Sequence, residues 1–151
     1  MTALPDPGAL WLAQAHPASW SVWADWERET YALLPVGRLW DVVTVPLSLL
    51  SSAADREREA WAQVPVLCDL GTDRGYVWVP RGTAATWPQG AHGTRALGDP
   101  WWLAVPRPLG PQVPERAWLQ APDAASALMH PGALRSALDI PADTAPGRSR
   151  P

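Results

Sequence analysis

The chain has 151 residues, a formal charge of −3 and one cysteine, and 47% of its residues are hydrophobic. This length fits one domain with a hydrophobic core, and the composition excludes a disordered chain. The acidic balance argues against non-specific nucleic-acid binding, and the single Cys68 excludes a disulfide framework and a cysteine-rich zinc site. No apolar run reaches the ~18 residues of a membrane helix, and the first residues lack the basic start of a secretory signal. We therefore expect a cytoplasmic protein with no membrane partner.

Hydrophobic periodicity and turn residues predict short helices and strands in the first half of the chain. Pro17 suits the first turn of a helix in which Trp20 and Trp23 form an aromatic stripe. The run 39–45 is apolar on both faces, which predicts a strand inside a sheet. In chain order, we expect a helix at 9–15, a helix after Pro17, strands at 30–35 and 39–45 around a turn at 36–38, a helix at 47–62, and strands at 64–70 and 76–80 joined by a turn at 71–75.

The last third of the chain alternates strands and loops. Its proline-rich stretch at 106–115 can donate few backbone hydrogen bonds and therefore predicts a loop. We expect, in order, a helical turn within 81–88, an edge strand at 92–97, strands at 101–106 and 116–121, and a helix at 131–140. This pattern predicts an α+β fold with a mostly antiparallel sheet and helices packed against it. The domain is expected to span residues 9–140, with flexible ends at 1–8 and 141–151.

No motif for nucleophilic, metal or phosphate-loop chemistry is complete. The sequence has no GxSxG elbow, and Cys68 lies in an apolar strand beside Asp69, which indicates a buried structural thiol. The histidines lack a second ligand at the spacing that zinc needs, and glycine-rich phosphate loops are absent. These motifs therefore assign no catalytic residue, no metal ligand and no cofactor.

Tryptophan is the main aromatic residue of this chain, with eleven copies and no phenylalanine. Most tryptophans must therefore fill ordinary core positions, and we expect Trp78 to be one of them. Trp101 and Trp102 are neighbours on a predicted strand, so their side chains should point to opposite faces. We expect one of the two in the core and the other on a contact surface.

Several strings of the sequence are similar to one known family. They are GRLWDVV at 37–43, VPRGTA at 79–84, WWLAVP at 101–106 and AWLQAPDAASALMHPGALRSAL at 117–138. With the order of the elements, they cover most of residues 9–140 and resemble small actinobacterial proteins related to the bifunctional DNA primase/polymerase N-terminal (prim-pol) domain. The resemblance implies a prim-pol-like α+β fold.

The resemblance also implies that the catalytic motifs are degenerate. An active domain of this family ends one strand with Asp-x-Asp, where two carboxylates on one face hold divalent metal ions. The resemblance places these positions at Val43 and Val45, so that Asp41 is the acid left on that face. An active domain of the family also has a histidine in the following hairpin; its place falls near residues 75–76, where this chain has no histidine. For the further acid that the family carries later in the chain, Asp99 is the nearby candidate. We therefore lean towards a protein that is not an enzyme.

Three functions are left open by the sequence. The first is a catalytically degenerate prim-pol-like domain that binds a protein, a nucleotide or a nucleic acid and acts as a binding or regulatory module. The second is a tryptophan-rich protein–protein interaction domain. The third is an active primase/polymerase-type nucleotidyltransferase with rearranged acids, such as Asp41 with Asp69, which would need a divalent metal. An unknown protein is the partner that we expect first. The candidate binding residues are Asp41, Asp69, Arg74, Arg81, Trp101 and Trp102.

Overall fold

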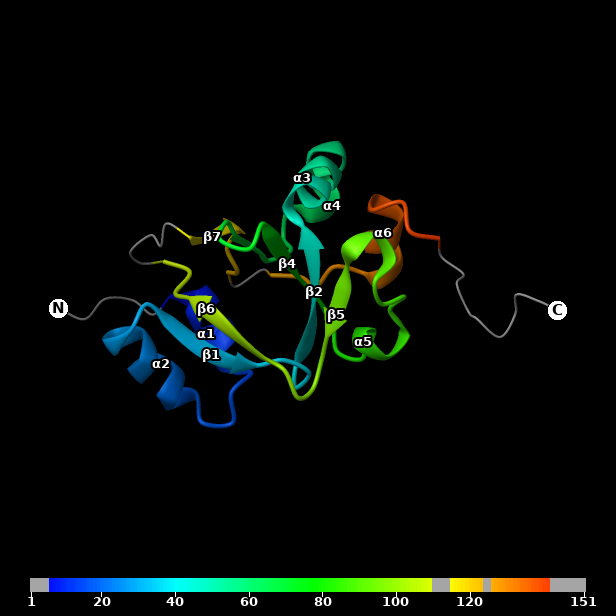
Figure 1. Ribbon diagram of the computed structural model, residues 1–151. Coiled ribbons are helices and arrows are strands. Elements are labelled where there is room, and N and C mark those ends of the chain that lie inside the picture. The colour runs from blue at the N-terminus through cyan, green and yellow to red at the C-terminus, as the bar shows by residue number, and fades with distance from the viewer. Residues whose placement is uncertain (1–5, 110–114, 124–125, 142–151) are drawn as a thin grey trace.

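The computed structural model describes residues 6–109, 115–123 and 126–141 (Figure 1). Its helices are α1 (Pro7–Ala13), α2 (Ser19–Arg28), α3 (Leu47–Arg56), α4 (Arg58–Trp61), α5 (Thr83–Thr86), the 3-10 turn η1 (Ala91–Gly93) and α6 (Pro131–Ala137). Its strands are β1 (Tyr31–Pro35), β2 (Trp40–Pro46), β3 (Val66–Asp69), β4 (Arg74–Pro80), β5 (Arg95–Leu97), β6 (Trp102–Pro106) and β7 (Arg116–Gln120). Within the described ranges, no helix has the length and apolar character that crossing a membrane requires.

The described strands form two antiparallel sheets. One has the order β5-β2-β4-β3-β7, and the other consists of β1 and β6. The expected α+β class with mostly antiparallel pairing is confirmed, but the expectation of one sheet is wrong. β1 does not pair with β2, its neighbour in the chain; it pairs with β6, with Tyr31 opposite Pro106. Gly37, with φ of 93°, carries the chain from the small sheet into the large one.

One face of the large sheet, which we call the valine face, carries Val43, Val45, Val77 and Val79. All four valines are fully buried in a cluster to which α3 and α6 contribute side chains such as Leu50. Figure 1 places α3, α4, α5 and α6 on this side of the sheet. Leu50 fills the space over β4 where Gly75 has no side chain, because a Cβ there would lie 2.1 Å from its Cδ2.

The other face, which we call the tryptophan face, carries Trp40, Trp78 and Trp118. The ring of Trp78 lies 5.3 Å from that of Trp40 and 5.4 Å from that of Trp118, between centroids. Trp78 is fully buried, as the sequence predicts. The helices α1 and α2 and the small sheet cover the part of this face that carries the three tryptophans (Figure 1). The indole N–H of Trp26 in α2 donates to the carbonyl oxygen of Val105 in β6 at 2.9 Å, which fixes α2 on the small sheet.

The ends of several elements differ from the expected ones. The helix expected at 47–62 breaks at Glu57, whose φ of −134° is not helical, and so divides into α3 and α4. The domain begins before residue 9, because the buried Asp6 side chain caps α1 by accepting from the N–H groups of Gly8 and Ala9. Residues 6–8 are therefore not a loose lead-in. The other expected flexible positions, 1–5 and 142–151, lie outside the described residues.

Candidate functional site

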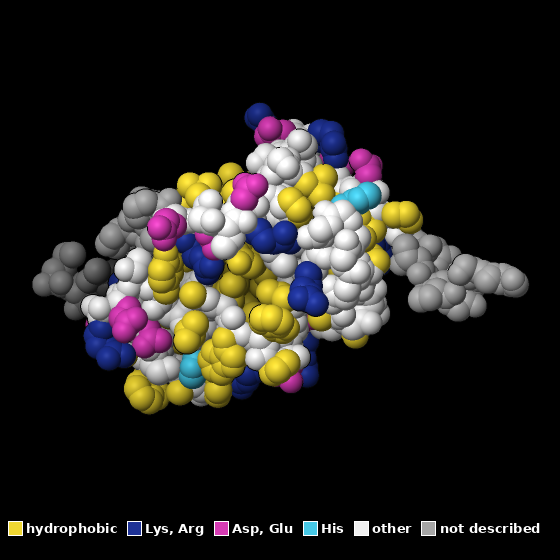
Figure 2. All heavy atoms as spheres, in the orientation of Figure 1, with side chains coloured by type: hydrophobic (Ala, Val, Ile, Leu, Met, Phe, Trp, Pro, Cys, Tyr) yellow, Lys and Arg dark blue, Asp and Glu magenta, His cyan; other side chains and the backbone are white. Residues whose placement is uncertain are grey.

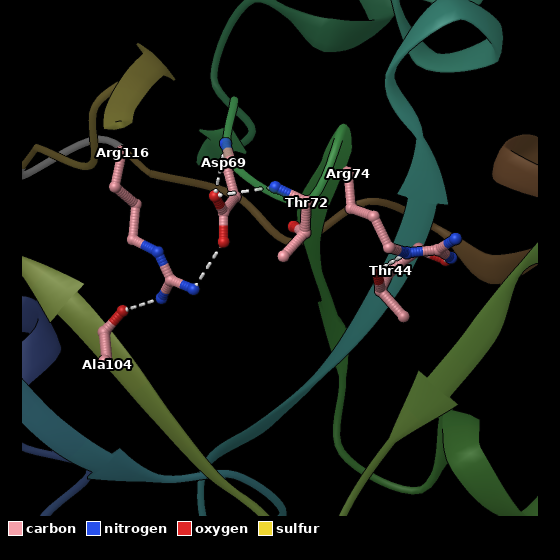
Figure 3. A network of polar contacts seen from close by, with 7 residues as sticks. Thr44, Asp69, Thr72, Arg74, Ala104 and Arg116 are labelled. Atoms are coloured by element: carbon pink, nitrogen blue, oxygen red, sulfur yellow. Dashed lines mark hydrogen bonds and ion pairs between the residues drawn. The ribbon is translucent and has the colours of Figure 1, made fainter. Parts of the chain in front are cut away.

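A polar cluster that includes Asp69, Arg74 and Arg116 lies on the tryptophan face, at the end where β3 stops and β4 begins (Figure 3). Asp69 ends β3 and is the register partner of Arg74 on β4 and of Arg116 on β7. Because side chains alternate along a strand, these three residues point to the same face as Tyr76 and Trp78. The cluster is therefore built by strand register.

Arg116 joins the two sheets within this cluster. Its Nη2 lies 2.7 Å from Oδ2 of Asp69, and its Nη1 donates to the carbonyl oxygen of Ala104 in β6. The guanidinium carbon also lies 5.7 Å from the ring centroid of Tyr31 and 5.4 Å from that of Tyr76. The positive charge of Arg116 is thus compensated by Asp69 and surrounded by aromatic rings.

Asp69 is an ionised carboxylate at neutral pH. Its Oδ1 accepts hydrogen bonds from the N–H groups of Gly71 at 3.0 Å and Thr72 at 3.3 Å, so the carboxylate also holds the β3–β4 turn. Burial raises the pKa of Asp69, but the hydrogen bond and charge of Arg116, with the hydrogen bonds from Thr72, lower it by more. The pKa therefore lies below its ordinary value of 3.8.

Arg74 and Arg95 carry positive charges that no carboxylate among the described residues neutralises. Arg74 donates from Nε to the hydroxyl of Thr44 at 2.7 Å, and from Nη2 to the carbonyl oxygens of Thr44 at 3.1 Å and Gly93 at 2.6 Å. These partners are all neutral. Arg95 is the register partner of Thr44 on β5 and is exposed, and its side chain makes no hydrogen bond or ion pair with any described residue.

Tyr76 lies between these charges and Arg116. It is the register partner of Thr44 on β4, and its ring is partly buried. In Figure 2, arginine side chains in dark blue border the yellow hydrophobic side chains in the centre of the view, where the surface is hollowed between the two sheets. This face can therefore offer guanidinium donors and an aromatic surface to one ligand.

The structure separates Asp41 from Asp69. Asp41 lies on the valine face and is paired with Val79, whereas Asp69 lies on the tryptophan face and is paired with Arg74. Val79 and Arg74 stand towards opposite ends of β4, about 16 Å of strand apart. The two carboxylates therefore cannot share a metal ion. The described residues also contain no group of three or more His, Cys, Asp or Glu side chains that could hold one.

The positions that the resemblance assigns to metal-binding acids do not face the polar cluster. Val43 and Val45 are fully buried on the valine face beneath the helices. The residues of β2 that share a face with Arg74 are Trp40, Val42, Thr44 and Pro46. A carboxylate at Val43 or Val45 would lie inside the apolar core and would not meet a ligand on the tryptophan face.

The other predicted binding residues lie elsewhere. Arg81 follows β4 and lines a cavity beside Asp41, so it does not join Arg74. Trp101 and Trp102 are 50% and 51% exposed, which makes wrong the expectation that one of them fills the core. Trp102 and His16 form a T-shaped ring pair, with centroids 5.6 Å apart. Of the six predicted residues, the structure brings only Asp69 and Arg74 together in the cluster.

Arg116 and Arg95 complete the cluster, and neither is among the six predicted binding residues. The available signal was alternation, because Arg116 opens a strand in which Trp118 shares its face. Alternation shows which residues share a face but does not reveal the neighbouring strand. The register of β7 with β3 supplies that information.

Comparison with protein-family models, with curated proteins and with solved structures gives no match to this chain. The functional assignment therefore rests on the residues and their geometry.

Proposed function

We propose that this chain is a catalytically degenerate, prim-pol-like domain that binds the phosphate groups of a nucleotide and acts as a cytoplasmic binding or regulatory module. The observation that supports it is the pair of uncompensated arginines on the tryptophan face, Arg74 and Arg95, on either side of Thr44. Guanidinium groups form strong, charge-assisted hydrogen bonds with phosphate oxygens. A preorganised Arg74 loses less side-chain freedom on binding than an arginine that is free in solvent.

The aromatic residues of the same face favour a nucleotide over inorganic phosphate. Tyr76 shares the face with both arginines, and Tyr31 lies across Arg116 from it. Aromatic rings beside positive charges suit a ligand that has both a base and a phosphate, since base stacking on an aromatic side chain contributes ~1–3 kcal/mol.

The proposal includes no catalytic step. Among the described residues of the cluster, Asp69 is the carboxylate, and Arg116 and the N–H groups of the turn already occupy its oxygens. A metal-dependent transfer would need at least two free carboxylates within reach of the same ions.

Calorimetric titration of the full chain with ATP, ADP and inorganic phosphate, with and without Mg²⁺, tests the proposal. We expect the nucleotides to bind more tightly than phosphate, and Arg95→Gln to weaken them about tenfold, because a hydrogen bond to a charged group contributes ~1.5–3 kcal/mol. Arg58→Gln is the matched control, because Arg58 is an exposed arginine of α4. The proposal would be contradicted if the unaltered chain bound no nucleotide. It would also be contradicted if Arg95→Gln and Arg58→Gln weakened nucleotide binding equally.

A second candidate function is protein binding through the small sheet. Leu33 in β1 is 54% exposed, Trp102 is half exposed on the same face of the small sheet, and Trp101, also half exposed, precedes β6. Exposed apolar side chains, tryptophan above all, are typical of interface hot spots. If this candidate is correct, the chain should capture a protein from a host lysate, and Trp102→Arg should abolish that capture while Arg95→Gln preserves it. Capture that is unchanged in both variants would count against it.

A further inference from the structure

A separate site lies on the valine face, around the side chain of Asp41. Its Oδ2 accepts hydrogen bonds from the N–H groups of Gly82 at 3.0 Å and Ala84 at 2.8 Å, and so holds the start of α5. Its Oδ1 has no hydrogen-bond partner among the described residues, although the residue is only 1% exposed. A buried carboxylate oxygen without a partner loses its hydration and gains nothing in return.

A cavity of ≈ 400 Å³ adjoins this carboxylate. A side chain at Gly98 would enter the space in front of Asp41, because its Cβ would lie 3.4 Å from each carboxylate oxygen and 3.1 Å from Cβ of Ala84. Gly98 therefore leaves the space beside the buried Asp41 carboxylate unfilled, on the side where the residue lines the cavity. The lining residues are Gly37, Asp41, Arg81, Gly82, Ala84, Ala85, Gly98 and Asp99.

The charges of the cavity favour a positively charged ligand. Asp41 and Asp99 contribute two carboxylates, and Arg81 contributes one guanidinium that forms no ion pair with the described residues. A carboxylate is only an acceptor, so the partner of Oδ1 must be a hydrogen-bond donor or a cation. Because the described residues offer no group of three metal-ligating side chains here, an N–H donor fits better than a metal ion.

We propose that this cavity binds the protonated amine of a small ligand, with one N–H of the ammonium group donated to Oδ1 of Asp41. Asp99 also lines the cavity and supplies the second negative charge. The site is independent of the nucleotide site, because Asp41 and the arginine pair lie on opposite faces of the large sheet. Either site can therefore fail while the other holds.

Two variants of the full chain separate the amine site from the structural role of Asp41. In Asp41→Asn, the amide oxygen can keep accepting from Gly82 and Ala84, while the amide NH₂ replaces the free oxygen with a donor. In Gly98→Ala, the carboxylate is unchanged and the new methyl group enters the cavity. Asp55→Asn, at an exposed position of α3, is the control for the loss of one charge.

The probes are ethylamine and putrescine as hydrochlorides, with tetramethylammonium chloride and MgCl₂ at equal ionic strength. NMR titration and thermal unfolding report binding. We expect the two primary amines to bind and to raise the unfolding temperature, and tetramethylammonium, which has charge but no N–H group, to do neither. The affinity for putrescine should fall at least tenfold in Asp41→Asn and Gly98→Ala and stay unchanged in Asp55→Asn.

Three results overturn the proposal. Equal responses to tetramethylammonium and putrescine would mean that charge alone acts. A response to Mg²⁺ without one to the amines would make the cavity a metal site. If no probe binds the unaltered chain, an ordered water is the partner of Oδ1 and the cavity has no amine ligand.

Discussion

Asp69 and Arg116 are register partners on neighbouring strands, and their side chains form an ion pair at 2.7 Å on the same face of the sheet. Arg116 also reaches the carbonyl oxygen of Ala104 on the other sheet. One arginine therefore links three strands, β3, β6 and β7, and its partner carboxylate holds the turn after β3. The stability of this corner should depend on the ionisation of Asp69.

The pH dependence of stability tests this link. Because the pKa of Asp69 is lowered in the folded chain, its contribution is complete above the ordinary value of 3.8 and is lost as the pH falls through the lowered pKa. We expect Asp69→Asn to lower the free energy of unfolding at pH 7 and to flatten its decline below about pH 4. Urea titrations from pH 2 to pH 7 measure both effects.

Asp25→Asn is the control for the Asp69 experiment. Asp25 pairs with Arg28 at 3.3 Å on the surface of α2, where solvent screens the pair. This variant should change the free energy of unfolding little at any pH. If both variants flatten the acid limb equally, Asp69 has no special role.

Trp78 should dominate the packing of the tryptophan face. It is fully buried between Trp40 and Trp118, so Trp78→Ala should cost ~3–5 kcal/mol of unfolding free energy. Trp20, which is 73% exposed, provides the comparison, and Trp20→Ala should stay within about 0.5 kcal/mol. Chemical denaturation followed by circular dichroism measures both, and similar losses would mean that burial does not decide the cost.

Gly37 should be less replaceable than other glycines with positive φ. A Cβ at Gly37 would lie 2.1 Å from the backbone nitrogen of Asp99, whereas a Cβ at Gly90 would meet no atom within 4 Å. Both have φ near +90°, so both alanine variants incur the left-handed cost of ~1–2 kcal/mol. Gly37→Ala should cost a further ~1–3 kcal/mol for the steric clash. Equal melting temperatures for the two variants would exclude that close approach.

Asp41 should stabilise the start of α5 even with no ligand present. Asp41→Ala removes the acceptor of two N–H groups and should cost ~1–2 kcal/mol. Asp41→Asn should cost less, because the amide oxygen can still accept from both. Thermal unfolding of the two variants gives the comparison, and an alanine variant as stable as the unaltered chain would mean that the two hydrogen bonds contribute nothing net.

Cys68 should react slowly with thiol reagents. It is half-buried in β3, and burial raises the pKa of its thiol above the ordinary value of 9.0. At pH 8 we expect labelling by a disulfide reagent to be slower in the folded chain than in urea. Labelling at the same rate in both states would show that the thiol is freely accessible when the chain is folded.

The local elements of this fold could be predicted from the sequence, whereas the strand pairing could not. The run 39–45 has apolar residues on both faces because β2 lies inside the large sheet, with β4 and β5 on its two sides. The positions of Tyr31 and Pro106 in the sequence, by contrast, do not indicate that they stand opposite each other. Pairing depends on contacts between distant segments, and periodicity reports only on near neighbours.

Because periodicity does not reveal strand pairing, only part of the candidate site could be predicted from the sequence. Asp69 and Arg74 flank one tight turn, so the sequence alone suggests that they are close. Arg116 joins them through the pairing of β3 with β7. Asp41 is among the predicted binding residues, but the sequence does not show that α5 folds over it and leaves it almost fully buried.

The pairing of β1 with β6 has a consequence for biosynthesis. β1 leaves the ribosome well before β6, its sheet partner among the described strands, so Ala32 and Leu34 are made before the residues that pair with them. During that interval the nascent chain exposes an unpaired strand edge, which is a site for aggregation. This edge should therefore become protected only after β6 has emerged, and a chain stalled on the ribosome before that point would keep β1 unpaired.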